Sequence, residues 1–176
     1  MKTVDFVRFV SALCLTILPA TGAGAQATSD PAFLISAFNE TCRRGFPDLE
    51  TIRQRAQSLG WVQRGARLIG ESSDRRLRDA PIPDFLQKGD MMMVLSSPNK
   101  LWSKSGCSVS VSGRETFDAG ALAAAVSAAL GGAEPEHAKE RGVERATWRV
   151  KSGIVVNVSV GKSGRTRTAT VAVLTN

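Results

Sequence analysis

The sequence predicts an α+β fold: two N-terminal helices, antiparallel strands, one buried alanine-rich helix and a C-terminal three-stranded antiparallel meander. Three observations lead to this prediction. Apolar residues recur at helical spacing over residues 34–59, alternate with polar residues over 106–112 and 154–160, and become nearly continuous over 119–130. Helices and runs of strands that do not alternate regularly are typical of the α+β class. Residues 26–176 have the length expected of a single domain.

The two N-terminal helices have recognisable start and stop signals. Ser29-Asp30-Pro31 supplies a capping side chain followed by proline, which is favoured in a first helical turn. The inward side of this helix is formed by residues at helical spacing: Leu34, Ile35, Phe38 and Cys42. A second amphipathic helix is predicted to begin at Pro47-Asp48 and to end at Gly60.

The central part of the chain is predicted to contain two or three antiparallel strands. Residues 91–95 form a continuous apolar run, and residues 106–112 alternate between valine and serine. The three methionines at 91–93 are soft metal ligands by type, but adjacent residues of a strand face opposite sides, so we predict core packing instead. Residues 61–62 are predicted to begin a short strand, and residues 84–89 to form one turn.

The C-terminal half begins with the alanine-rich helix, capped by Asp118. Residues 119–130 carry no charge, which predicts a helix buried on all sides, with a dimer interface as the alternative. Strands are predicted over 143–150, 154–160 and 167–174, joined by glycine-containing turns. Arg145, Arg149 and Lys151 are expected to share the polar face of the first of these strands.

Residues 1–25 have the pattern of a cleaved bacterial signal peptide. Lys2 and Arg8 precede a mostly apolar run over 9–18, and Ala23-Gly24-Ala25 fits the small-residue rule for signal peptidase. The apolar run is shorter than the roughly 20 residues that span a bilayer. We therefore expect a periplasmic or secreted protein that is not integral to the membrane, with a retained N-terminal anchor as the alternative.

Export determines how the cysteines are interpreted. Removal of the leader removes Cys14 and leaves Cys42 and Cys107, and two thiols in an oxidising compartment usually pair. This bond would close a loop of 65 residues, which the chain-entropy model values at about 4 kcal/mol. The alternative is a thiol nucleophile with His137 as its base. It is disfavoured because residues 134–140 read as a polar loop.

Positive charge gathers near the C-terminus. The chain has 23 basic and 16 acidic residues, and residues 145–176 contain no acid. Such asymmetry indicates an anionic partner. Outside the cytoplasm this partner would be lipid phosphate, lipopolysaccharide, a cell-wall polymer or an acidic protein surface. Nucleic acid is disfavoured in that compartment. The candidate anion-binding residues are Arg149, Lys151, Lys162, Arg165 and Arg167. The alternative is an ordinary solvated sheet face whose basic residues serve solubility.

The sequence contains no recognisable catalytic motif. Gly161-Lys162-Ser163 resembles the end of a phosphate-binding loop, but Val156 occupies the position of the required first glycine. One histidine and two bonded cysteines do not make a zinc site of the usual type, so no metal or cofactor is predicted. Two alternatives to a binding protein remain: a hydrolase that uses Asp or Glu from residues 61–90, and an inhibitor of a secreted enzyme.

The organisation of the chain resembles that of small exported α+β proteins of unknown function from proteobacteria. The features that carry this resemblance are the leader, a cysteine on the first helix, and a cysteine that opens a strand after a tryptophan-containing run. The resemblance implies a periplasmic location and no catalytic activity. We therefore expect a non-enzymatic binding or interaction module for an anionic component of the cell envelope.

Overall fold

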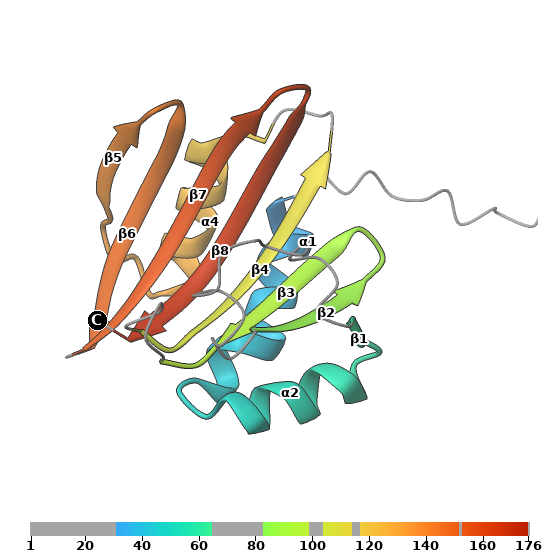
Figure 1. Ribbon diagram of the computed structural model, residues 1–176. Helices are drawn as coiled ribbons and strands as arrows, with labels where there is room; N and C mark the ends of the chain where they lie inside the picture. The colour runs from blue at the N-terminus through green and yellow to red at the C-terminus, as the bar shows by residue number, and fades with distance from the viewer. Residues whose placement is uncertain (1–30, 65–82, 99–103, 114–116, 152, 176) are drawn as a thin grey trace, which may run out of the picture.

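The computed structural model describes residues 31–64, 83–98, 104–113, 117–151 and 153–175, which fold as an α+β structure (Figure 1). The helical elements are α1 Pro31–Phe38, the π-helical turn η1 Asn39–Arg43, α2 Leu49–Ser58 and α4 Ala119–Ala129. The strands are β1 Val62–Arg64, β2 Asp84–Lys88, β3 Met91–Ser96, β4 Gly106–Gly113, β5 Glu136–Glu140, β6 Val143–Lys151, β7 Ile154–Ser163 and β8 Thr166–Thr175.

All eight strands form one antiparallel sheet in the order β1-β2-β3-β4-β8-β7-β6-β5. The order divides the sheet into two four-stranded meanders, each preceded in the chain by helix. The two meanders are joined by the pairing of β4 with β8, and Val109 lies opposite Val171 in the middle of this strand pair. Both valines are fully buried. The centre of the sheet is therefore made by residues that lie far apart in the sequence.

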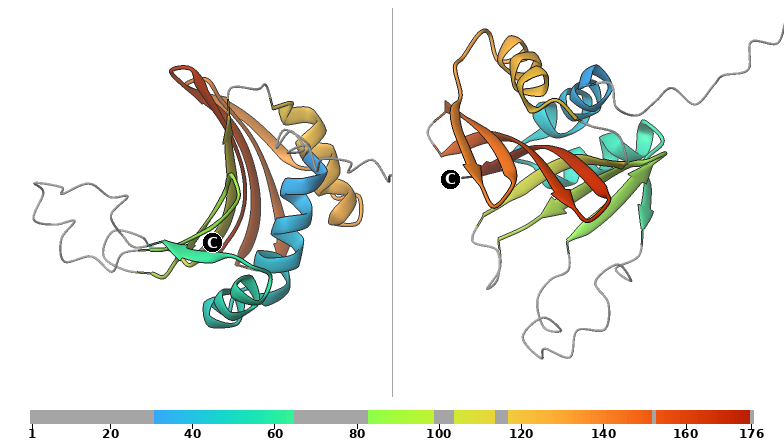
Figure 2. Two further views of the ribbon diagram at one scale, coloured as in Figure 1. Left: turned by 90° about the vertical axis from the view of Figure 1, so that its right-hand side faces the viewer. Right: turned by 90° about the horizontal axis from the view of Figure 1, so that it is seen from above.

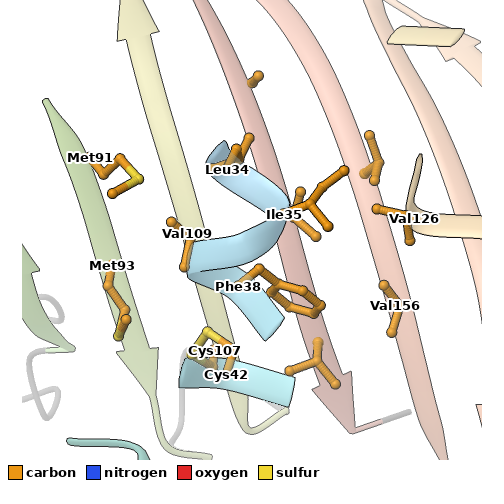
Figure 3. Packing of buried hydrophobic residues seen from close by; sticks show 14 of the residues in the cluster. Leu34, Ile35, Phe38, Cys42, Met91, Met93, Cys107, Val109, Val126 and Val156 are labelled. Carbon is orange, nitrogen blue, oxygen red and sulfur yellow. A yellow bond between two sulfur atoms is a disulfide. The ribbon is translucent and has the colours of Figure 1, made fainter. Parts of the chain in front are cut away.

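Helices α1 and α4 cover one face of this sheet (Figure 2). Helix α1 lies over β4 and β8, and α4 lies over β6 and β7. Leu34, Ile35 and Phe38 point from α1 toward the sheet, where they meet the inward side chains of the strands (Figure 3). This arrangement follows from the helical spacing of the three residues and the two-residue alternation of the strands. The hydrophobic core is the layer between the helices and this face.

Aspartates cap both longer helices, as the sequence predicts. The Asp48 carboxylate accepts hydrogen bonds from the backbone N–H groups of Glu50 and Thr51 at 3.0 and 3.2 Å. The Thr51 hydroxyl also donates to Asp48, at 2.7 Å, and these bonds lower the pKa of Asp48 from its ordinary value of 3.8. The Asp118 carboxylate accepts from the N–H groups of Gly120 and Ala121 at 2.8 and 3.1 Å. Each aspartate satisfies N–H groups that have no partner within the helix.

Two segments predicted as turn or loop are strands. Residues 84–89 contain β2, and residues 134–140 contain β5, so the C-terminal meander has four strands and not three. Every side chain of β5 is exposed, because the strand lies at the edge of the sheet. Without a buried side, the sequence of β5 shows no alternation that would reveal a strand.

The prediction that the alanine-rich helix is buried on all sides is also wrong. Leu122, Ala123 and Val126 of α4 are buried, whereas Ala121, Ala124 and Ala128 are exposed. Small side chains allow the helix to approach the sheet closely, but only one side of the helix packs against other described residues.

The predicted leader lies outside the described residues, as do residues 65–82 of the alternative hydrolase region.

Candidate functional site

The predicted disulfide is present and joins the helical layer to the sheet. Cys42 lies in η1 and Cys107 lies near the start of β4, with 5.5 Å between their Cα atoms. Neither side chain is exposed. Figure 3 shows the bond on the core side of β4, close to Phe38. Cys42 reaches this place because it follows Phe38 by one turn on the inward side of the same helical segment. The bond therefore anchors the central strand β4.

The five predicted anion-binding residues form two separate groups. Arg149 and Lys151 lie at the end of β6, next to the β6–β7 connection, whereas Lys162, Arg165 and Arg167 lie at the β7–β8 hairpin. Strand β7 separates the groups by about 26 Å, at about 3.3 Å per residue. The structure therefore brings together three of the five residues and places the other two at the opposite end of the sheet.

Within the first group, Arg149 and Lys151 do not share a face of the sheet. A bulge between them shifts the register, so that Arg149 lies opposite Val155 and Lys151 lies opposite Ile154. Because adjacent residues of β7 face opposite sides, the two basic side chains also diverge. Arg149 forms an ion pair with Glu136, with 3.5 Å between Nε and Oε1. The prediction of a shared polar face is therefore wrong for Lys151.

The second group, here called the hairpin cluster, is Lys162, Arg165 and Arg167. Lys162 lies directly opposite Arg167 on the paired strands, and Arg165 lies in the two-residue turn between them. Gly164, the other turn residue, has a φ of +60°. This conformation is accessible to glycine at little cost and is required at the first position of a type II′ hairpin turn. The turn thus holds the three cations within one short loop.

None of the three cations of the hairpin cluster forms an ion pair with a residue that the structure describes. On the neighbouring strand β6, Glu144 lies opposite Val160, but its carboxylate already binds Lys139 at 2.7 Å. Like charges directly opposite on paired strands destabilise a hairpin. Within the part of the chain that the structure describes, the hairpin cluster is therefore positive charge without an acidic partner.

The face of the sheet that points away from α1 and α4 is a further feature, which we call the open face. Its central side chains are small, uncharged and able to form hydrogen bonds: Ser108, Ser110, Ser112, Thr147, Asn157, Ser159, Thr168 and Thr170. The hydroxyl groups of Ser112 and Thr168 form a hydrogen bond across the strands, with 2.8 Å between the oxygens. The Thr147 hydroxyl donates a hydrogen bond to the side-chain oxygen of Asn157 at 2.7 Å. The sequence signal was the alternation of serine or threonine with valine in β4, β7 and β8.

A cavity of about 480 Å³ lies on the open face, at the end where β4 begins and β8 ends. Its lining is mostly apolar and includes Val94, Ala172 and Leu174. The polar lining side chains are Ser96, Ser108, Thr170 and Lys104. The sequence does not predict this cavity, because the cavity depends on the pairing of β4 with β8, which no local pattern specifies.

A second cavity, of about 440 Å³, lies between the first turn of α4 and strands β5 and β6. His137 belongs to its lining, together with Lys139, Glu144 and Arg145. The Lys139–Glu144 ion pair crosses this lining at 2.7 Å. The N–H groups of Gly120 and Ala121 are taken by Asp118, so the start of α4 has already used the donors that would hold an anion.

Most of the region assigned to the alternative hydrolase, residues 61–90, lies outside the described residues, and Asp84 is one of its acids that the structure describes. Glu50 and Asp84 both bind the guanidinium of Arg53, and the bond to Asp84 raises the pKa of Arg53. The described residues also contain no group of three side chains suited to hold a metal ion. Among these residues, no helix is both long and apolar enough to cross a bilayer.

Comparisons with protein families, characterised proteins and solved structures found no match to this chain.

Proposed function

We propose that this chain is a non-enzymatic binding module that holds an anionic component of the cell envelope through the hairpin cluster. The observation that carries this proposal is the direct opposition of Lys162 and Arg167, with Arg165 in the turn between them. Such an arrangement costs stability in the free protein. An anion that lies between the cations would remove the repulsion, so the cost is recovered on binding.

The shape of the hairpin favours an extended anionic surface over a small ion. The β7–β8 hairpin forms one end of the molecule (Figure 1), and its turn curves away from the helical layer (Figure 2, left). Lys162 and Arg165 are exposed, and Arg167 is half-buried. A projecting tip can contact a flat array of phosphate groups, as at a lipid or lipopolysaccharide surface, without enclosing any one of them.

Two features support a location outside the cytoplasm. The disulfide between Cys42 and Cys107 is typical of proteins in oxidising compartments. The sequence of residues 1–25 also has the composition of a signal peptide. In the bacterial envelope, surfaces rich in phosphate are abundant, which agrees with the net charge of +7.

The test compares two triple charge reversals on vesicles of phosphatidylglycerol and phosphatidylcholine. One variant carries Lys162→Glu, Arg165→Glu and Arg167→Glu. Each basic residue near an anionic membrane contributes about 1 kcal/mol, so this variant should bind at least about 100-fold more weakly.

The control variant reverses the same number of charges at the other end of the molecule: Arg43→Glu, Arg44→Glu and Lys151→Glu. It should bind within a few-fold of the wild type, because its net charge changes equally but the hairpin cluster stays intact. Equal loss of binding in both variants would show that only the total charge matters, and would contradict a site at the hairpin.

A further inference from the structure

The cavity on the open face combines features that the hairpin cluster lacks. Its volume of about 480 Å³ falls in the range of small-molecule sites, about 300–1,000 Å³. Its floor is formed by β4 and β8, where Ser108 pairs with Ala172 and Gly106 pairs with Leu174. On the other side of β4, Val94 lies opposite Ser108. The floor therefore alternates between apolar side chains and small hydroxyl groups.

The floor of this cavity is rigid. Cys107 lies between Gly106 and Ser108, and its disulfide fixes β4 to η1 on the opposite side of the sheet. Gly106 has no room for a side chain, since a Cβ there would lie 2.5 Å from Cδ2 of Leu174. The close approach keeps Leu174 over the strand, where it forms one wall of the cavity. A preformed site loses less conformational entropy when it binds a ligand.

The charge of the lining indicates the kind of ligand. Lys104, two residues before β4 begins, is the one charged residue among those that line the cavity. Arg149 lies on the same open face, two strands from Leu174, but it is outside the lining and is paired with Glu136. The cation of the lining thus stands at the end of the cavity where β4 begins, and Val94 and Ala172 lie further along the strands. A ligand that matches this arrangement has an apolar body and a single negative charge at one end.

We propose that the open-face cavity binds a small anionic amphiphile of the alkyl carboxylate class. The alkyl chain lies against Val94, Ala172 and Leu174, and the carboxylate lies toward Lys104. The hydroxyl group of Ser96, which lies opposite Gly106 at this end of the cavity, is placed to donate to the other carboxylate oxygen. This site is separate from the hairpin cluster, which lies at the other end of β8. An experiment can therefore refute one of the two proposed sites without refuting the other.

The first test is nuclear magnetic resonance of the ¹⁵N-labelled wild-type protein with decanoate below its micelle concentration. The amide signals of Val94, Ser108, Ala172 and Leu174 should shift and saturate together. 1-Decanol, which lacks the charge, should bind about three- to fivefold more weakly, the range expected for one partly exposed ion pair. Acetate, which lacks the chain, should cause no saturable shift over the same concentrations.

A matched pair of variants tests the location. Ser108 lines the cavity, whereas Ser112 lies four residues along β4 on the same face and outside the lining. Ser108→Phe should fill the cavity and weaken decanoate binding at least about tenfold, and Ser112→Phe should leave it within about twofold. Lys104→Gln should remove the preference for decanoate over decanol. Circular dichroism checks that each variant is folded. If Ser108→Phe does not fold, the residues whose amide signals shift in the wild-type protein locate the ligand.

Three results would overturn the proposal. Decanoate shifts confined to the hairpin or spread over the helices would place the ligand elsewhere. Equal affinities for decanoate and decanol would remove the role assigned to the charge. Equal binding by the Ser108→Phe and Ser112→Phe variants would exclude the cavity. The triple reversal at the hairpin cluster should leave decanoate binding unchanged, which separates this proposal from the proposed function.

Discussion

Loss of the disulfide should reduce the stability of the protein by an amount that the sequence separation sets. Cys42 and Cys107 close a loop of 65 residues, and the chain-entropy model assigns about 4 kcal/mol to a loop of that length. A domain of ordinary stability has about 5–15 kcal/mol in total. For a chain of this size, the loss corresponds to a fall in Tm of about 8–16 °C.

Urea unfolding of oxidised and reduced protein measures this loss directly. Trp61 and Trp148 are buried, so their fluorescence reports unfolding. The reduced protein keeps both sulfur atoms, so its loss reflects mainly the missing constraint on the unfolded chain. Its m-value should rise, because the unfolded state without the bond exposes more surface. The Cys42→Ala, Cys107→Ala double variant should lose somewhat more, since it also gives up packing in the core. Equal stability of the oxidised and reduced forms, within about 1 kcal/mol, would refute the reasoning.

Three further predictions concern the hairpin and the helix caps. Lys162→Glu should stabilise the protein by about 0.5 kcal/mol in urea unfolding, because it replaces a like-charge pair with an opposite-charge pair. The same change should weaken binding to anionic vesicles. A loss of stability would contradict the repulsion between Lys162 and Arg167 that we infer. Asp118→Ala should cost about 1 kcal/mol by the same assay, whereas Asp118→Asn should cost less because an amide oxygen still caps α4. The pKa of Asp48 is lowered by its bonds to Thr51, so its stabilising effect is present above its unfolded pKa and is lost as the pH falls through the lowered value. Asp48→Asn should make the stability of the protein less sensitive to pH in this acidic range, and an unchanged pH profile would show that the cap does not act through its charge.

The elements that sequence analysis predicts well are those with a buried side and local signals. Helix α2 begins after Asp48 and ends before Gly60, which has a φ of +84°. Strands β3, β4, β6, β7 and β8 all contain the predicted strand segments. The pairing of Cys42 with Cys107 also follows from the number of cysteines outside the predicted leader. Each of these inferences rests on neighbours within a few residues or on a simple count.

The elements that sequence analysis misses depend on distant partners. Among the described strands, β5 pairs with β6 alone, through a turn in which Arg141 and Gly142 both have positive φ. Its polar sequence, in which all five side chains are exposed, carries no sign of that pairing. Likewise, β2 is defined by its two neighbours, β1 and β3. Strand pairing is a property of the tertiary structure, and local propensity describes it poorly.

The candidate sites show the same division. The basic character of the C-terminal segment is a property of the sequence, but its separation into two groups depends on the length of β7 and on the bulge between Arg149 and Lys151. The open-face cavity needs the pairing of β4 with β8, whose residues are about 60 positions apart. Chemical type could therefore be predicted from the sequence, whereas the grouping of residues could not.

The salt dependence of membrane binding tests the proposed function most directly. Wild-type protein is mixed with vesicles that contain phosphatidylglycerol, and the bound fraction is measured by sedimentation as the salt concentration rises. Attraction between the hairpin cluster and lipid phosphate predicts strong binding at low salt that falls steeply as the charges are screened. Vesicles of pure phosphatidylcholine should retain little protein at any salt concentration. Retention that is the same in low and high salt, or on neutral and anionic vesicles, would contradict the account.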